Sequence, residues 1–96
     1  DTDAAWKGAA GKTLLLRVVK LLKERRCRVN NVDVVILAEK PRIGARKLEM
    51  KKNIAEWLGI DMSRVNIKAT TMEGVDAVGR CEAIAAQAIA SLCEDV

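Results

Sequence analysis

The residues with the clearest capacity for chemistry are two hydroxyls and a carboxylate: Thr70, Thr71 and Glu73. The residues before them, 65–69, alternate between apolar and polar side chains, which is typical of a β-strand with one buried face. In open α/β sheets, ligands bind outside the carboxyl ends of the strands. Hydroxyls and free backbone N–H groups can bind phosphate oxygens, whereas a carboxylate beside a phosphate needs a bridging cation. The segment therefore predicts a site for a phosphorylated ligand, with an ordinary Thr-rich turn as the alternative.

A second candidate loop begins where the apolar segment Val32–Ala38 ends. The β-branched, nearly continuous apolar character of this segment predicts a strand covered on both faces. The only proline, Pro41, then stops the strand within the run Glu39-Lys40-Pro41-Arg42. Such a loop exposes backbone N–H and C=O groups that suit the edge of a flat ring such as a nucleobase. An ordinary strand-to-helix turn with two exposed cations is the alternative.

Helical patterns surround these two strands. After an irregular lead-in, Asp1–Gly8, Thr13 is predicted to cap a helix over Leu14–Arg26. Its apolar stripe is expected to be buried, and its basic end is interpreted as a solvated terminus that suits the helix dipole. The stripe consists of Leu14, Val18, Leu21 and Leu22, and the basic end of Lys23, Arg25 and Arg26.

Two further helices are predicted. One covers Ala45–Leu58 and ends at Gly59. A loop, Gly74–Gly79, precedes a last helix over Arg80–Cys93, which is so nearly apolar all round that we expect it to be covered on several sides, at a subunit interface. The core stripe of the middle helix is expected to be Met50, Ile54, Trp57 and Leu58.

The order of these elements, α-β-α-β-α, predicts the fold class. A strand, a helix and a second strand form a right-handed crossover with parallel strands, so both candidate loops should lie at one edge of the sheet. Two strands with three apolar helices make an incomplete sheet. We therefore expect an α+β fold with an α/β-like crossover, a partial mixed sheet covered by helices, and amino-terminal strands missing from this single partial domain of residues 1–96.

Composition narrows the classes of function. The 96 residues carry a formal charge of +4, which suits an anionic small ligand and is too weak to indicate nucleic acid. With two Trp and no Phe or Tyr, the chain lacks a base-stacking platform. The three cysteines have no C-x-x-C spacing, and there is no histidine for a zinc site or a catalytic triad. We expect no transmembrane segment and no signal peptide.

Seven spaced runs resemble the carboxyl-terminal part of the 2-C-methyl-D-erythritol 2,4-cyclodiphosphate synthase family. The resemblance implies a homotrimer that closes a 4-diphosphocytidyl-methylerythritol 2-phosphate into a cyclic diphosphate and releases CMP, a phosphorus-oxygen lyase of non-mevalonate isoprenoid biosynthesis. The runs are Asp1-Thr2-Asp3, Trp6-Lys7-Gly8, Asn31-Val32-Asp33-Val34, Ala38-Glu39-Lys40-Pro41-Arg42, Val65-Asn66-Ile67-Lys68-Ala69-Thr70-Thr71, Gly79-Arg80 and Ile84-Ala85-Ala86.

The resemblance also implies roles for individual residues. Asp1 and Asp3 would border the methylerythritol phosphate, and Ala38, Glu39, Lys40, Pro41 and Arg42 would form the cytidine pocket. Thr70 and Thr71 would bind the diphosphate, and Glu73 would ligate magnesium, so that Thr71 and Glu73 are the expected catalytic residues. Arg80 and Glu82 would line the centre of the trimer.

The chain also departs from the family pattern. The family binds zinc through an Asp-x-His and a further His, and the sequence has none of these ligands, so we expect the chain to be inactive unless another polypeptide supplies them. The alternative is a non-catalytic structural subunit of a larger assembly, such as a plastid one, derived from that enzyme. Val75-Asp76-Ala77 resembles the plant and algal branch of the family. The expected compartment is therefore the plastid stroma, or else a bacterial-type cytoplasm.

Overall fold

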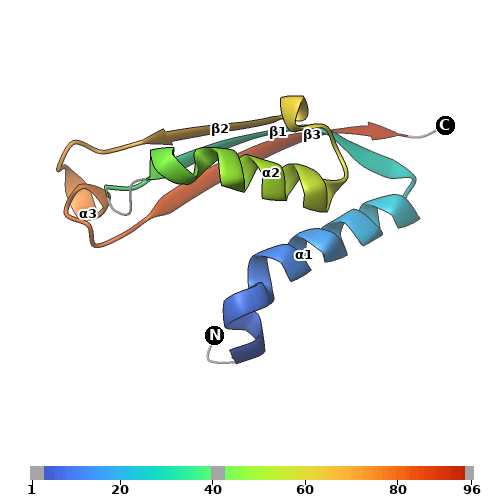
Figure 1. Ribbon diagram of the computed structural model, residues 1–96, viewed down its shortest axis with the longest axis horizontal. Helices are drawn as coiled ribbons and strands as arrows, with labels where there is room; N and C mark the ends of the chain where they lie inside the picture. Colours follow the sequence, from blue (N-terminus) through green and yellow to red (C-terminus); the bar gives the residue numbers. More distant parts are fainter. Residues whose placement is uncertain (1–3, 40–42, 95–96) are drawn as a thin grey trace.

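The computed structural model describes the backbone of residues 4–39 and 43–94 and, from residue 11 onward, their side chains. Three strands form one mixed sheet in the order β2-β1-β3 (Figure 1). The strands are β1 (Cys27–Leu37), β2 (Val65–Thr70) and β3 (Ala85–Glu94); the helices are α1 (Ala4–Glu24), α2 (Lys47–Leu58) and the short α3 (Asp76–Gly79), with 3-10 turns at Ile43–Arg46 and Met62–Arg64. The α+β class with a mixed sheet is confirmed.

The strand prediction for residues 65–70 and its crossover are also confirmed. β1 and β2 pair in parallel, with Val32 opposite Val65 and Ile36 opposite Ala69. Val65 and Ile67 are buried, whereas Asn66, Lys68 and Thr70 are exposed, because successive side chains of a strand point to opposite faces. The helix between the two strands spans α2, close to the predicted range.

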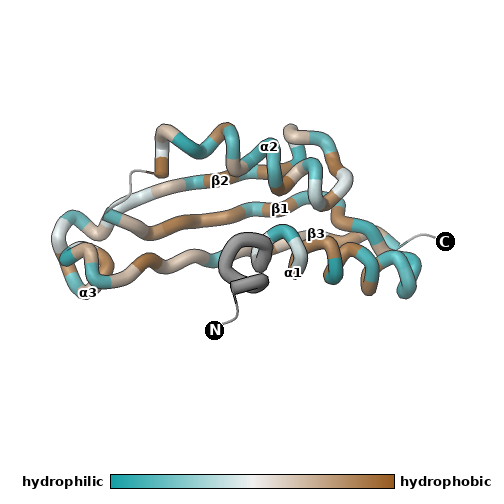
Figure 2. The backbone as a smooth tube through the Cα atoms, turned by 60° about the horizontal axis from the view of Figure 1, so that its bottom comes forward, coloured by the Kyte–Doolittle hydropathy of each residue, from teal (hydrophilic) through white to brown (hydrophobic). Residues whose placement is uncertain are grey.

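The hydrophobic core lies between the sheet and α2. Figures 1 and 2 place α1 and α2 on the same side of the sheet, α2 over β2 and β1, and α1 toward β3. Met50 and Ile54 of α2 pack against the buried cluster, as predicted. This cluster consists of Ile36, Ala38, Ala55, Val65 and Ile67. Because the helices cover one face of the sheet, the expectation that β1 is covered on both faces is wrong: Asp33 is exposed.

α2 ends at Leu58 and Gly59 is its cap, the stop residue predicted from the sequence. Gly59 adopts a left-handed conformation with φ 71°, and its N–H donates to the carbonyl oxygens at the end of the helix. A Cβ at this position would meet no atom within 4 Å, so the backbone conformation alone disfavours a side chain.

Gly59→Ala is expected to lower the free energy of unfolding by about 1 kcal/mol, because an L-residue is strained at this φ. Gly44→Ala is the matched control, since its Cβ would also enter open space and its φ is not in the left-handed region. Urea denaturation of both variants measures the difference. Equal stability of the two variants would show that the cap conformation is not the reason for glycine at position 59.

The last predicted helix is wrong. Residues 85–94 form β3, which pairs antiparallel with β1 from Cys27–Glu94 to Leu37–Ala85. Alanine is the best helix former and suggested a helix, but the free edge of β1 offers backbone partners along the whole segment, and tertiary pairing overrides local preference. Gln87 and Ser91 do alternate with alanines, a period-two signal that the apolar composition obscured.

The structure also differs from the predictions at the beginning of the chain and in the loop before β3. α1 already begins at Ala4, so residues 4–8 are helical rather than irregular, and Thr13 lies inside the helix instead of capping it. Most of the predicted buried stripe of α1 is exposed, because the helix contacts β1 and α2 with a neighbouring stripe. That neighbouring stripe is half-buried and consists of Leu15, Val19 and Leu22. The loop at residues 74–79 contains α3.

Polar side chains hold the end of the sheet that lies opposite the candidate site. Arg64 donates to the Asn30 side-chain oxygen at 2.6 Å and to its carbonyl oxygen at 3.2 Å, and Asn30 donates to Ser91 Oγ at 3.3 Å. These bonds link the 3-10 turn before β2 to β1 and β3, beside the irregularity between Val29 and Asn31. Asp61 caps the turn before β2, and its hydrogen bond from Ser63 N–H lowers the pKa of its carboxyl.

Candidate functional site

The ends of the two parallel strands meet at one edge of the sheet. Ala38 N–H donates to the Thr70 carbonyl oxygen at 3.0 Å, which continues the pairing past the end of β1. The next residue, Glu39, reaches across to the turn that follows β2. Its Oε1 accepts from Met72 N–H at 2.9 Å and from Gly74 N–H at 3.3 Å. One carboxylate oxygen thereby ties the first candidate loop to the second.

The turn held by Glu39 has an unusual backbone. Glu73 has a φ of 51° and Gly74 a φ of 81°, both in the left-handed region. Thr71 Oγ1 accepts from Glu73 N–H at 3.3 Å, which stabilises the turn locally. Gly79 lies so close to Gly74 that a Cβ on it would be 2.3 Å from the Gly74 carbonyl carbon. The turn is therefore shaped by Glu39 on one side and by a glycine-to-glycine contact on the other.

A cavity of about 330 Å³ opens beside this junction, at the small end of the size range of ligand sites. It is bounded by the ends of both strands and by the 3-10 turn before α2. Its lining residues are Ala38, Glu39, Ile43, Gly44, Ala45, Ala69, Thr70 and Thr71. Both threonines are exposed, so their hydroxyl groups are accessible to a ligand. Glu73 is exposed on the same turn but does not line the cavity.

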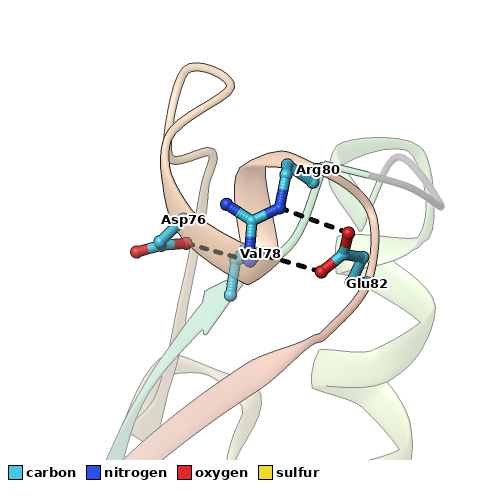
Figure 3. A network of polar contacts seen from close by, with 4 residues as sticks. All are labelled: Asp76, Val78, Arg80 and Glu82. Carbon is cyan, nitrogen blue, oxygen red and sulfur yellow. Dashed lines mark hydrogen bonds and ion pairs between the residues drawn. The ribbon is translucent and has the colours of Figure 1, made fainter.

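The segment after this turn places the two charges that the family resemblance assigned to a trimer centre (Figure 3). Arg80 Nε donates to one oxygen of Glu82 at 3.2 Å and its Nη2 to the other at 3.3 Å. Asp76 accepts from Val78 N–H at 2.9 Å at the start of α3. The arginine and glutamate side chains are 57% and 59% exposed, so the pair forms a solvent-facing charged group.

The acidic groups of this site do not form a preassembled metal centre. Within residues 4–39 and 43–94, no group of three or more His, Cys, Asp or Glu side chains could hold a metal ion. Glu73 is thus not part of such a group, which fits magnesium as it is bound by one or two carboxylates together with substrate phosphates. Zinc needs a set of nitrogen, sulfur or carboxylate ligands, and the described residues do not provide one.

The structure brings together some of the predicted site residues and says nothing of others. Ala38, Glu39, Thr70 and Thr71 surround one cavity. Five predicted site residues lie outside the described residues: Asp1, Asp3, Lys40, Pro41 and Arg42. Sequence reasoning missed Ile43, Gly44 and Ala45 as lining residues. It also missed the role of Glu39, although a carboxylate directly after a strand, facing a turn rich in free N–H groups, is a readable signal.

No helix in the described part of the chain is long and apolar enough to cross a lipid bilayer.

The sequence matches known proteins along almost its whole length. Residues 1–93 match the family model described as the YgbB family. The 2-C-methyl-D-erythritol 2,4-cyclodiphosphate synthase of Desulfosudis oleivorans is 48% identical over 95 residues, which cover 99% of this chain and 56% of that protein. The synthase of Alkaliphilus metalliredigens is 48% identical over 92 residues, 96% of this chain and 58% of its own length. The chain thus spans a little over half the length of these relatives.

Solved structures agree with this match. The 2C-methyl-D-erythritol 2,4-cyclodiphosphate synthase of Plasmodium vivax superposes with a TM-score of 0.86 at 33% identity, over 98% of this chain and 65% of that one. The Plasmodium falciparum IspF in complex with CDP superposes with a TM-score of 0.80 at 26% identity, over 92% and 56%. The sequence match over residues 1–93 and the shared fold lead to one conclusion: the chain belongs to the YgbB family.

Proposed function

We propose that this chain is the nucleotide- and magnesium-binding part of a 2-C-methyl-D-erythritol 2,4-cyclodiphosphate synthase-like domain. The observation that carries the proposal is the junction of the two strand ends, where Glu39 joins the loops and the Thr70 and Thr71 hydroxyls border one cavity. A cavity of this kind offers hydroxyls to an anionic ligand and backbone groups to a base edge. Relatives carrying the synthase name, and a solved relative in complex with CDP, support the same ligand class.

Each side chain has a part in this proposal. Thr70 and Thr71 donate hydrogen bonds to the diphosphate oxygens, and the segment beginning at Ala38 and Glu39 contacts the cytosine ring. Lys40, Pro41 and Arg42 are also proposed to line the cytidine pocket. Asp1 and Asp3 are proposed to border the methylerythritol end of the substrate. In phosphoryl transfer, the protein acts by positioning the reacting groups and neutralising their charge, which matches a site of hydroxyls, N–H groups and cations.

Glu73 is the proposed ligand of magnesium. Glu73 would hold the ion, which would supply positive charge to neutralise the diphosphate. The exposed position of Glu73, on the turn that also carries Thr71, suits a carboxylate that binds the ion only together with a nucleotide. No step is assigned to zinc, because the chain has no histidine and its described part has no ligand cluster. The 96-residue chain alone is therefore proposed to bind the nucleotide without cyclising the substrate.

Calorimetric titration with CDP tests the proposal. The chain is expected to bind CDP in the presence of magnesium, and to bind it more weakly without the ion. Thr71→Val should weaken binding about tenfold, because a hydroxyl that donates to a charged phosphate is lost. Thr13→Val in α1 is the matched control and should bind as the parent does. A folded chain that gives no heat with CDP and magnesium would refute a nucleotide site.

The trimeric arrangement also belongs to the proposal. β3 takes the place that the sequence suggested for an interface helix, and its Ile89 side chain is 68% exposed, on the face of the sheet that α1 and α2 leave uncovered. Arg80 and Glu82, in the segment that leads into β3, are proposed to face the centre of the trimer. In sedimentation velocity experiments, the parent chain should form a trimer, and the charged side chain of Ile89→Lys should weaken that trimer. A monomeric parent would count against the proposed trimer.

A non-catalytic structural subunit remains the second candidate. It is favoured by the absence of histidine together with exposed apolar residues on β3. It predicts stable assembly without CDP binding, whereas the first candidate predicts binding, so the calorimetric and sedimentation results separate the two. The curated relatives reported above are bacterial, which favours the bacterial-type cytoplasm over the plastid among the compartments expected from the sequence.

A further inference from the structure

The net positive charge of this protein lies in α1 and the two residues that follow it. Residues 12–26 carry six cations and one carboxylate, a net charge of +5, whereas the other 81 residues carry 11 cations and 12 carboxylates, a net charge of −1. The entire positive excess of the chain therefore resides in α1 and the two residues that follow it. Although the net charge of the whole chain is small, the surface of α1 is strongly basic.

The same helix carries exposed apolar side chains. Its half-buried stripe is turned toward the rest of the fold, and a second stripe lies beside it on the outer face, here defined as Leu14, Arg17, Val18, Lys20 and Leu21. Leu14 is 51% exposed, Val18 49% and Leu21 50%. Figure 1 shows α1 at the margin of the molecule, with no other described element on its outer side, and Figure 2 shows hydrophobic and hydrophilic residues alternating along the coloured part of the helix.

We propose that the outer face of α1 binds the surface of an anionic lipid bilayer. The exposed apolar side chains would enter the boundary between headgroups and acyl chains, and the flanking Arg17 and Lys20 would extend their charged ends to lipid phosphates. The helix would lie along such a surface, with its axis parallel to the bilayer plane.

Other occupants fit this face less well. A second copy of the chain would bring a second strongly basic helix, and like charges repel. An acidic protein would satisfy the charge, but a stable protein interface buries about 800 Å² on each partner, and the helix from residue 12 to 24 is only about 20 Å long. A bilayer needs no shape complementarity, only apolar side chains and cations along one face.

Co-sedimentation of the 96-residue chain with lipid vesicles tests this proposal. We expect binding to vesicles of phosphatidylcholine with phosphatidylglycerol, little binding to pure phosphatidylcholine, and weaker binding at high salt. Arg17→Gln with Lys20→Gln should lower the partition coefficient roughly 30-fold, because each cation near an anionic leaflet contributes about a factor of five. Leu14→Gln with Leu21→Gln should lower it about tenfold or more while preserving helix propensity.

Two controls on α2 match these variants. Lys47→Gln with Lys52→Gln removes the same charge from exposed positions, and Leu48→Gln alters a side chain that is 65% exposed. Both controls should bind as the parent does. Absence of binding to anionic vesicles, equal losses in the α2 controls, or unchanged binding of the leucine variants would each overturn the proposal. Binding to polyglutamate but not to vesicles would overturn it in favour of an acidic protein partner.

Discussion

Replacing Glu39 with alanine is expected to accelerate hydrogen exchange of the Met72 and Gly74 amides about 10- to 100-fold, because a hydrogen bond to a charged acceptor contributes roughly 1.5–3 kcal/mol. Both amides donate to the same carboxylate oxygen, at 2.9 and 3.3 Å. Without that acceptor, the turn that carries Thr71 loses its attachment to the end of β1. Hydrogen exchange followed by NMR measures the effect residue by residue and needs no ligand.

A second readout of the same variant concerns the proposed function. If the turn must be held in place to bind diphosphate, Glu39→Ala should also weaken CDP binding by about 10-fold or more. Glu39→Gln retains an acceptor oxygen and should recover part of both effects. Glu49→Ala, an exposed glutamate on α2, is the matched control. Unchanged exchange at both amides in Glu39→Ala would show that this carboxylate does not hold the turn.

Ile67→Ala is expected to lower the free energy of unfolding by about 2–5 kcal/mol, through lost burial and the cavity left behind. Ile67 is 2% exposed and belongs to the cluster shared by β1, β2 and α2. A chain of this size has a total stability of only about 5–14 kcal/mol, so this one change would remove a large part of it.

Chemical denaturation, started from conditions in which the parent chain is folded, measures the loss of unfolding free energy. Leu48→Ala is the control, because its side chain is 65% exposed and alanine is at least as good a helix former as leucine. It should change the stability by less than about 0.5 kcal/mol. Similar losses in the two variants would mean that the core is not organised around β2.

The structure was predicted best where the local residue pattern agrees with the burial that the fold imposes. Val65 and Ile67 alternate with polar residues and lie in a strand whose inner face is buried, so period and burial give the same answer. The parallel pairing of β1 and β2 followed from the helix between them, because a crossover of that kind brings strand ends to one edge. The arrangement of Thr70, Thr71 and Glu39 around one cavity is a consequence of that topology.

The errors arose where a neighbouring element decides the outcome. The alanines of β3 favour a helix in isolation, and only the vacant edge of β1 makes them a strand. Leu14 and Val18 have the spacing of a buried stripe, yet the rotation of α1 about its axis is set by its contacts with β1 and α2, which no local pattern encodes. The bond from Glu39 to Gly74 joins residues 35 positions apart and depends on the path of the intervening chain.

β3 also has a consequence for handling the protein. It is an outer strand of the sheet, and over its ten residues the only charged side chain is Glu94, at its very end. Proteins usually protect such strands with lysines, prolines or kinks that prevent another chain from adding to the ladder. Concentrated solutions of this chain should therefore be prone to intermolecular sheet growth, and a single lysine placed midway along the strand would act as a gatekeeper against it.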